Sequence, residues 1–291
     1  MARQNSPIFV LGLPRSGTTW LASVLGTASG IKQFHEPFNK DHVPEAAQHW
    51  NRYLRIEDVD PEFDSFCQRV FAGRMTDSYT RCKLSWPYRA WGKKMSWLPG
   101  RVMVKDVHAL VCLDRISTLV APQVVIVNRH PCGLADSWVR TFPAARNSKS
   151  VKGLDRLLQQ PQLIDDYLEP FTGLLSSRDD FFQSIALYWG VVNYIWQQQR
   201  RQHPDWIFVQ HEELCTDPKA AYEKLFSKLN LVWTDRTNEI LQNSTNRDAM
   251  QPYSPVRISS QEPEKWLSRL SGDQIDLVKK TMSIFNLPIY S

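Results

Sequence analysis

The chain has 291 residues, of which 42% are hydrophobic and 22% are charged. These values are ordinary for a soluble globular protein with a full core, and they exclude a disordered tail, a collagen-like fibre or a membrane bundle. The formal net charge of +5 is too small to indicate a nucleic-acid partner, which would require a clustered basic stripe. It fits a protein that holds an anionic small ligand.

Short apolar runs alternate with helix-like segments along the chain. Strands are predicted at 8–11, 33–35, 102–104, 124–127 and 206–209. Helices are predicted at about 18–28, 179–201, 217–229 and 271–285. Strands that alternate with helices favour an α/β fold with a central parallel sheet flanked by helices.

Two stretches interrupt this alternation. Residues 39–100 are Trp-rich and partly helical in pattern, and residues 141–177 are polar and contain three prolines. Because open α/β sheets bind ligands at the carboxyl ends of their strands, we expect both insertions to form a substrate cap there. No repeat or linker divides the chain, which predicts a single domain over 1–291. The first insertion carries an aromatic group that either lines an acceptor pocket or forms its own core: Trp86, Tyr88, Trp91 and Trp97.

The cysteines are odd in number and widely spaced, without a Cys-x-x-Cys pair: Cys67, Cys82, Cys112, Cys132 and Cys215. This pattern indicates neither a disulfide framework nor a zinc site, and it favours reduced thiols. The N-terminal residues do not resemble a signal peptide, and the sequence contains no apolar run of about 18 residues. We therefore expect a cytoplasmic protein without a membrane partner.

A glycine-rich loop, Gly12-Leu-Pro-Arg-Ser-Gly-Thr-Thr19, follows the first predicted strand and opens a helix. Its glycine spacing is that of a phosphate-binding loop, whose backbone N–H groups and helix N-terminus attract an anion. The Lys that nucleotide kinases carry after the second glycine is Thr18 here, and the positive charge lies at Arg15. The strand 124–127 also ends without an acidic Mg²⁺ ligand. The loop is therefore predicted to bind an anion without a metal.

The segment Leu13-Pro-Arg-Ser-Gly-Thr-Thr-Trp-Leu21 resembles the 5′-phosphosulfate loop of the sulfotransferases. These enzymes transfer a sulfuryl group from 3′-phosphoadenosine 5′-phosphosulfate (PAPS) and release adenosine 3′,5′-bisphosphate (PAP). A second motif has Arg129 after a strand and Ser137 eight residues later. The resemblance implies a P-loop-like sulfotransferase domain in which Arg129 and Ser137 bind the 3′-phosphate of the donor. It implies that these loop residues also contact the donor: Arg15, Ser16, Gly17, Thr18, Thr19 and Trp20.

Weaker similarities extend the resemblance to most of the chain. The segment 209–214 looks like the strand and acidic pair of the family, where His211 stands in place of a Tyr near the adenine. Glu264-Lys-Trp266 resembles the segment before the last helix. Between them lies a polar stretch in which Arg257 is either a phosphate contact or a solvated charge.

Sulfuryl transfer needs a base for the acceptor proton and positive charge for the leaving phosphate oxygen. Glu36 is our first candidate for the base, because tyrosyl-protein, carbohydrate and bacterial sulfotransferases have a Glu at a similar place. Such a Glu would be useful as a base if partial burial raised its pKa. His108 is the alternative, one residue too far from Lys105 for the Lys-x-His pattern of aryl and steroid sulfotransferases. Lys105 and Arg15 are assigned to the bridging oxygen, and His35 is expected on the opposite face of its strand.

The sequence thus predicts a PAPS-dependent sulfotransferase for a hydroxyl or amine of a small molecule, with a specialised metabolite as first candidate. A carbohydrate or tyrosyl-peptide sulfotransferase is the alternative within the family. A P-loop kinase or NTPase, or a non-catalytic nucleotide-binding protein, is the alternative outside it. No metal is expected, since His42 and His49 have no partner at metal-ligand spacing. The oligomeric state stays open.

Overall fold

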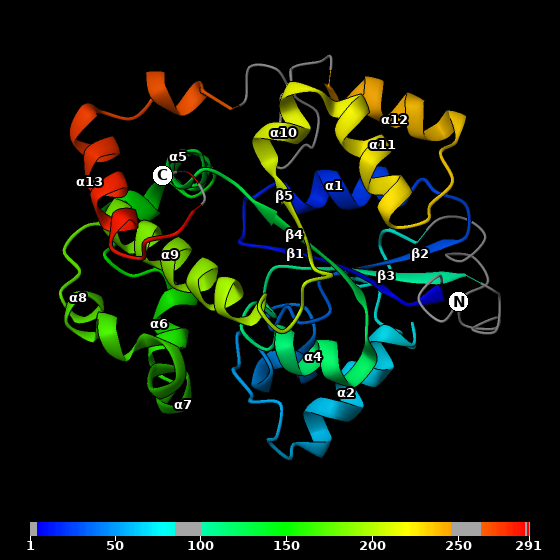
Figure 1. The fold of residues 1–291 in the computed structure, drawn as a ribbon, viewed down its shortest axis with the longest axis horizontal. Helices are drawn as coiled ribbons and strands as arrows, with labels where there is room; N and C mark the ends of the chain where they lie inside the picture. The colour runs from blue at the N-terminus through cyan, green and yellow to red at the C-terminus, as the bar shows by residue number, and fades with distance from the viewer. Residues whose placement is uncertain (1–4, 85–99, 246–262, 289, 291) are drawn as a thin grey trace.

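The structure is a computed structural model that describes residues 5–84, 100–245, 263–288 and 290. Within these residues, five parallel strands form one sheet in the order β2-β3-β1-β4-β5 (Figure 1). The strands are β1 (Ile8–Gly12), β2 (Ile31–His35), β3 (Arg101–Asp106), β4 (Gln123–Asn128) and β5 (Ile207–Gln210). The predicted α/β fold with a central parallel sheet flanked by helices is confirmed.

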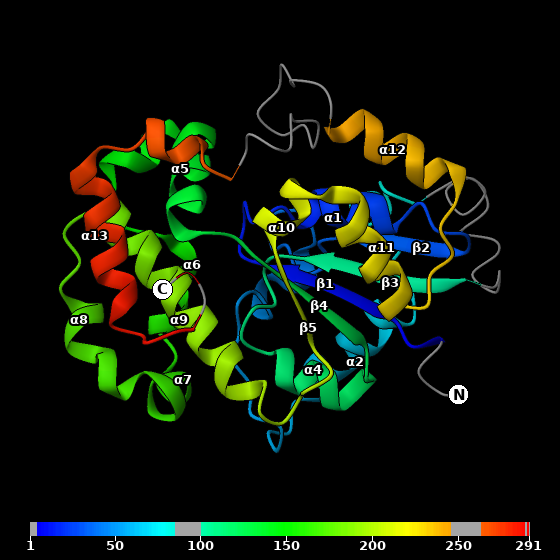
Figure 2. The same cartoon turned by 45° about the horizontal axis from the view of Figure 1, so that its top comes forward.

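Both faces of the sheet are covered, so the central strand β1 is buried on each side. Ile8 and Val10 belong to one apolar core, and Phe9 and Leu11 belong to the other. The first core is covered by α1 (Thr18–Leu25), α10 (His211–Thr216), α11 (Pro218–Lys228) and α12 (Asp235–Thr245). The second is covered by α2 (Pro61–Phe71) and α4 (Leu113–Val120). Figure 2 shows these two layers on either side of the strands.

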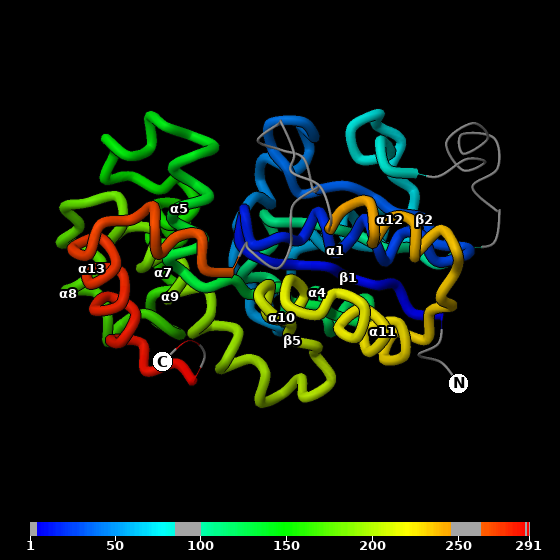
Figure 3. Tube along the Cα trace, turned by 90° about the horizontal axis from the view of Figure 1, so that it is seen from above, coloured from blue at the N-terminus to red at the C-terminus, as the bar shows by residue number. Residues whose placement is uncertain are grey.

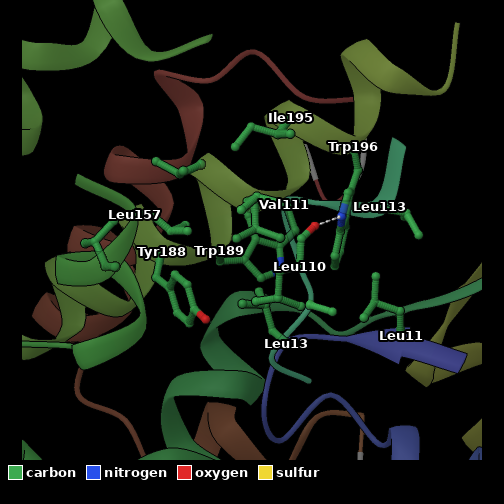
Figure 4. Close-up of a cluster of buried hydrophobic side chains, with 14 of the residues drawn as sticks. Leu11, Leu13, Leu110, Val111, Leu113, Leu157, Tyr188, Trp189, Ile195 and Trp196 are labelled. Atoms are coloured by element: carbon green, nitrogen blue, oxygen red, sulfur yellow. Dashed lines mark hydrogen bonds between the residues drawn. The ribbon is translucent and has the colours of Figure 1, made fainter. Parts of the chain in front are cut away.

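A third group of helices lies beside the sheet, beyond the carboxyl end of β4 (Figures 1 and 3). It consists of α5 (Pro131–Thr141), α6 (Lys152–Leu158), α7 (Pro161–Leu163), α8 (Thr172–Ser176), α9 (Phe181–Gln199) and α13 (Gly272–Ser283). Helix α9 joins this group to the sheet through buried tryptophans. The indole N–H of Trp196 donates to the carbonyl of Leu110 at 2.7 Å, among the side chains of Figure 4. Short turns complete the described chain: η2 (Pro44–Gln48), η3 (Pro143–Asn147), η4 (Ile164–Leu168), η5 (Glu169–Phe171) and η7 (Lys265–Ser268).

The predicted helices are present, but the predicted C-terminal boundary of the first helix was wrong. Helix α11 begins where Asp217 accepts a hydrogen bond from the Ala220 amide at 3.1 Å, and Ser271 forms a capping box at α13. The prediction extended the first helix to residue 28, whereas α1 ends at Leu25. The chain leaves the helix at Gly26, and the Thr27 hydroxyl bonds to the Val24 carbonyl and to Thr237 of α12.

The two insertions contribute differently to the fold. Helix α2, from the first, packs Phe63 and Phe66 into the core on one sheet face. The helices α6 to α8, from the second, pack beside α9. The aromatic group from Trp86 to Trp97 lies outside the described residues. The role of the insertions as a substrate cap stays a prediction.

His130 begins the helix that carries the second predicted motif. Its Nδ1 accepts a hydrogen bond from the Cys132 amide at 3.2 Å, and its ring stacks on Trp266 at 4.6 Å. Burial, with a smaller effect of the Lys279 and Arg129 charges, lowers the pKa of His130 to about 4. In the unfolded chain the His130 ring takes up a proton near pH 6.5, whereas in the folded protein it stays neutral until about pH 4. The contribution of the neutral ring to stability is therefore fully present above pH 6.5. This stabilisation is lost as the pH falls toward 4.

We therefore predict that His130→Asn makes stability less sensitive to acid. Asn keeps a side-chain acceptor at the helix N-terminus but does not titrate. Between pH 7 and pH 5, the free energy of unfolding of the wild-type protein should fall by about 2 kcal/mol more than that of the variant. Urea unfolding at the two pH values measures this difference. Equal losses in the two proteins would show that His130 does not carry the effect.

Candidate functional site

A cavity of about 690 Å³ opens at the carboxyl edge of the sheet. The phosphate loop after β1, the segment after β2, the segment after β3, the residue after β4 and the later half of α5 all contribute to its lining. Loops that follow parallel strands meet at this edge, which is where open α/β sheets bind ligands. The cavity therefore brings together both predicted motifs and the predicted catalytic residues.

The phosphate loop is held in a conformation that only a few residues adopt. Arg15 and Gly17 have φ values of 76° and 97°, in the left-handed region. A Cβ atom on Gly17 would lie 2.5 Å from Nδ1 of His211, so the loop accepts only glycine at this position. Helix α1 begins directly afterwards at Thr18, which turns its N-terminal N–H groups toward the cavity. This geometry suits an anion.

The remaining predicted loop residues differ in how much of them reaches the cavity. Thr18, Thr19 and Trp20 line it, whereas Ser16 is buried beneath the loop. The indole N–H of Trp20 donates to Ser244 of α12 at 2.9 Å. Any contact of Trp20 with a ligand would therefore be made by the carbon atoms of its ring and not by its N–H group.

The two predicted motifs contact each other directly. Arg129 donates from Nη1 to the carbonyl of Arg15 at 3.1 Å, and Arg15 donates from Nε to Ser137 Oγ at 3.3 Å. All three residues line the cavity. The carbonyl of Arg129 accepts from the Trp189 indole at 2.9 Å, which fixes the end of β4 against α9. The tertiary fold thus joins side chains more than 100 residues apart into one cationic corner.

His211 lies behind the phosphate loop at the start of α10. Burial lowers its pKa well below the usual range, so the ring is neutral. Its Nε2 is 3.5 Å from Cys215 Sγ, and its Nδ1 has no hydrogen-bond partner among the described residues. The ring lines the cavity and contacts the loop, but an adenine contact stays a prediction. Arg257 lies outside the described residues.

Glu36 follows β2 in an unusual backbone conformation. Its φ is 45°, in the left-handed region that a residue before proline avoids. The turn is held from both sides, because the Glu36 amide donates to the Lys105 carbonyl at 2.7 Å. The Phe38 amide donates to the Asp106 carboxylate at 2.8 Å. The fold thus holds a locally unfavourable turn at the cavity, as strained functional positions often are.

The carboxylate of Glu36 is contacted from several sides of the cavity. Lys105 Nζ forms an ion pair with Oε1, while Tyr79 and Asn39 donate to Oε2 at 2.8 and 3.0 Å. Burial by itself would raise the pKa of Glu36, but the Lys105 ammonium and the hydrogen bonds outweigh it and lower the pKa well below the usual range. The condition that a raised pKa would make Glu36 useful as a base is therefore not met in this structure. Glu36 is ionised while Lys105 holds it.

His35 does not point away from Glu36, which corrects the expectation from strand alternation. Its Nε2 lies 3.9 Å from Glu36 Oε1, and both residues line the cavity. Alternation fails here because the left-handed turn at Glu36 ends the extended chain. Burial, with the nearby Lys105 charge, lowers the pKa of His35 to about 4, so the ring is neutral near pH 7.

His108 lies on the other side of the same carboxylate. Its Nε2 is 3.7 Å from Glu36 Oε2, and its backbone amide donates to Asp106 at 2.7 Å. Its Nδ1 accepts from the indole N–H of Trp50 at 3.1 Å. Both candidate bases, Glu36 and His108, are thus in one cluster with Lys105.

Sequence reasoning missed several residues of this cluster: Asn39, Trp50 and Tyr79, together with His42, whose ring stacks on Tyr79 at 4.0 Å. No motif marks them. Tyr79 is 43 residues from Glu36, and Trp50 is 58 residues from His108. Only the path of the first insertion brings Asn39, His42 and Tyr79 to the cavity and Trp50 to His108.

The sequence profile of the Sulfotransferase family matches residues 7–235. The chain belongs to the sulfotransferase family. The match spans more than half of the chain and includes both motifs, from the phosphate loop to the helix that carries Ser137. The prediction from these motifs is confirmed, and sulfuryl transfer is the general activity that the family membership supports.

Solved structures of the family share this fold. Mouse sulfotransferase SULT7A1, solved in complex with PAP, is 13% identical with a TM-score of 0.51, covering 98% of this chain and 85% of that chain. The sulfotransferase domain from the curacin biosynthetic pathway is 15% identical with a TM-score of 0.54, covering 97% of each chain. At these identities the likeness shows the fold. No curated protein sequence matches this sulfotransferase.

Three further features of the described residues concern metal sites, membrane spans and cysteines. Across 5–84, 100–245 and 263–288, no group of three or more His, Cys, Asp or Glu side chains is arranged to hold a metal ion. In the same ranges, no helix has the length and apolar character needed to span a bilayer. Each of the five cysteines is a free thiol, and all except Cys82 are buried.

Proposed function

We propose that this sulfotransferase transfers a sulfuryl group from PAPS to a hydroxyl or amine of a small-molecule acceptor, with Glu36 as the base. One observation carries the proposal. The ionised carboxylate of Glu36 and the cationic corner of Arg15 and Arg129 line the same cavity. Lys105 pairs with this carboxylate from β3, the strand that lies between β2, which precedes Glu36, and β1, which precedes the phosphate loop. A base and an anion site in one cavity are what transfer between two bound substrates requires.

The chemistry of the cavity fits the donor. PAPS carries a 3′-phosphate and a 5′-phosphosulfate, and the cavity offers guanidinium groups, two ammonium groups and helix N–H groups. In our proposal, Arg129 and Ser137 hold the 3′-phosphate, and the loop from Arg15 to Thr19 holds the 5′-phosphosulfate. The close contact between the corner residues would then couple the two ends of the nucleotide.

The proposed reaction is one in-line displacement at sulfur. The acceptor oxygen or nitrogen forms the new bond to sulfur, and its proton moves to Glu36. The bond between sulfur and the phosphate oxygen breaks, and its electron pair stays on the phosphate of PAP. Lys105 and Arg15 stabilise the charge that develops on this oxygen.

The depressed pKa of Glu36 gives Lys105 a second task in this proposal. A carboxylate held by an ammonium group is a weak base. When the donor phosphate attracts Lys105, Glu36 loses its strongest counter-charge and its pKa rises toward the range useful for general-base catalysis. Donor binding would therefore activate the base.

Incubation with labelled PAPS and a panel of acceptors tests the function. The panel contains phenols, aliphatic alcohols, amines, sugars and a tyrosyl peptide, so that carbohydrate and peptide acceptors are tested beside small molecules. We expect label transfer to at least one acceptor, undiminished by EDTA. Transfer from ATP that stops with EDTA would favour a kinase. PAP binding without turnover on any acceptor would favour a non-catalytic protein.

A further inference from the structure

Trp50 belongs to no sequence motif, yet it contacts one of the two candidate bases. Its indole N–H donates to His108 Nδ1 at 3.1 Å. An indole nitrogen can only donate, so Nδ1 must present its lone pair. The proton of the neutral imidazole then resides on Nε2, which is the nitrogen 3.7 Å from Glu36 Oε2. The Trp50 contact therefore decides which nitrogen of His108 can donate into the cavity.

Backbone hydrogen bonds next to Trp50 and His108 hold these two rings in position relative to each other. The Asn51 amide donates to the His108 carbonyl at 2.7 Å, and the His108 amide donates to Asp106 at 2.7 Å. Asp106 also accepts from the Phe38 amide in the turn that follows Glu36. Trp50, His108 and Glu36 are thus tied to one another through backbone as well as side chains.

We propose that Trp50 is a positioning residue that locks neutral His108 in its Nε2–H form, so that His108 donates a hydrogen bond beside Glu36 and does not act as the base. This inference rests on the proposed function, since it assigns the roles within the same site. Nδ1 accepts from the Trp50 indole and Nε2 carries the proton, so neither nitrogen of His108 offers a free lone pair for the proton of the acceptor. His108 instead orients the carboxylate and the acceptor oxygen while Glu36 takes the proton.

The tautomer is measured without any substrate, by the ¹⁵N NMR shifts of the His108 ring in the full-length protein. We expect a protonated Nε2 and an unprotonated Nδ1 in the wild-type protein. We expect Trp50→Phe, which keeps an aromatic ring but removes the N–H, to populate the other tautomer. A wild-type ring with its proton on Nδ1 would overturn the proposal. Because this measurement needs no turnover, it is independent of whether PAPS is the donor.

Kinetics with PAPS and an identified acceptor provide the second readout. Trp50→Phe should lower kcat about tenfold, as for one lost oriented hydrogen bond, with the KM for PAPS unchanged. The matched control is Trp233→Phe, which removes an indole hydrogen bond to Asn238 away from the cavity and should leave kcat unchanged. An unchanged kcat in Trp50→Phe would contradict the proposed role.

The variant His108→Gln separates a donor from a base. Its amide N–H can replace the Nε2–H, but it cannot accept the proton of the acceptor. We expect His108→Gln to retain a kcat within about tenfold of the wild-type value, and Trp50→Phe to cost less in this background because Gln has no tautomers. A His108→Gln variant without turnover, at unchanged stability and PAP binding, would make His108 the base and overturn the proposal.

Discussion

Glu36→Gln should abolish most turnover while leaving donor binding intact. General-base catalysis contributes about 10²- to 10⁴-fold, and we expect kcat to fall by that factor. Affinity for PAP should be unchanged or higher, because the substitution removes the carboxylate that competes with phosphate for Lys105. Turnover with labelled PAPS and calorimetric titration with PAP, on the same sample, measure the two quantities.

This variant needs a check on folding, since Lys105 is only 3% exposed at its side chain and loses its ion-pair partner. A measured Tm and intact PAP binding serve this purpose. Glu57→Gln, an exposed carboxylate outside the cavity, is the control and should keep the wild-type rate. Wild-type turnover in Glu36→Gln, together with an inactive His108→Ala, would move the base to His108.

Removal of the Arg129 guanidinium should weaken binding of the 3′-phosphate selectively. Arg129 is buried at the cavity, where charge-assisted hydrogen bonds to phosphate are strong. We expect Arg129→Ala to weaken PAP binding about 10- to 100-fold, and adenosine 5′-monophosphate, which lacks the 3′-phosphate, far less. The affinity of Arg129→Lys for PAP should lie between those of the wild-type protein and Arg129→Ala, because Lys keeps the charge but lacks the planar guanidinium. Calorimetric titration of each variant with both nucleotides measures the difference.

The contact between Arg129 and the Arg15 carbonyl provides the competing explanation. If Arg129 mainly supports the phosphate loop through that hydrogen bond, both nucleotides should lose affinity equally. Equal losses would therefore remove Arg129 from the 3′-phosphate. Arg201→Ala, at an exposed position beyond α9, is the control for a general charge effect and should bind both nucleotides as the wild-type protein does.

Local sequence patterns were sufficient to predict the fold class and to locate both phosphate-binding motifs. Apolar runs of three or four residues predicted most of the strands because a parallel sheet buries both faces, and Asp217-Pro218 predicted the start of α11 because capping is local. The loop around Arg15 and Gly17 was predictable because its backbone conformation depends on glycine spacing within a few residues. Each of these signals acts over one turn or one strand.

Tertiary structure decided the surroundings of Glu36. The sequence by itself predicted a carboxylate after a strand, which would be useful as a base if partial burial raised its pKa. The fold brings Lys105, from the adjacent strand β3, and Tyr79, from the first insertion, against it, and these contacts lower the pKa instead. It also turns His35 into the cavity and sets Trp50 on His108. The charge and proton positions of a buried group depend on neighbours distant in the chain, and only the folded chain brings them together.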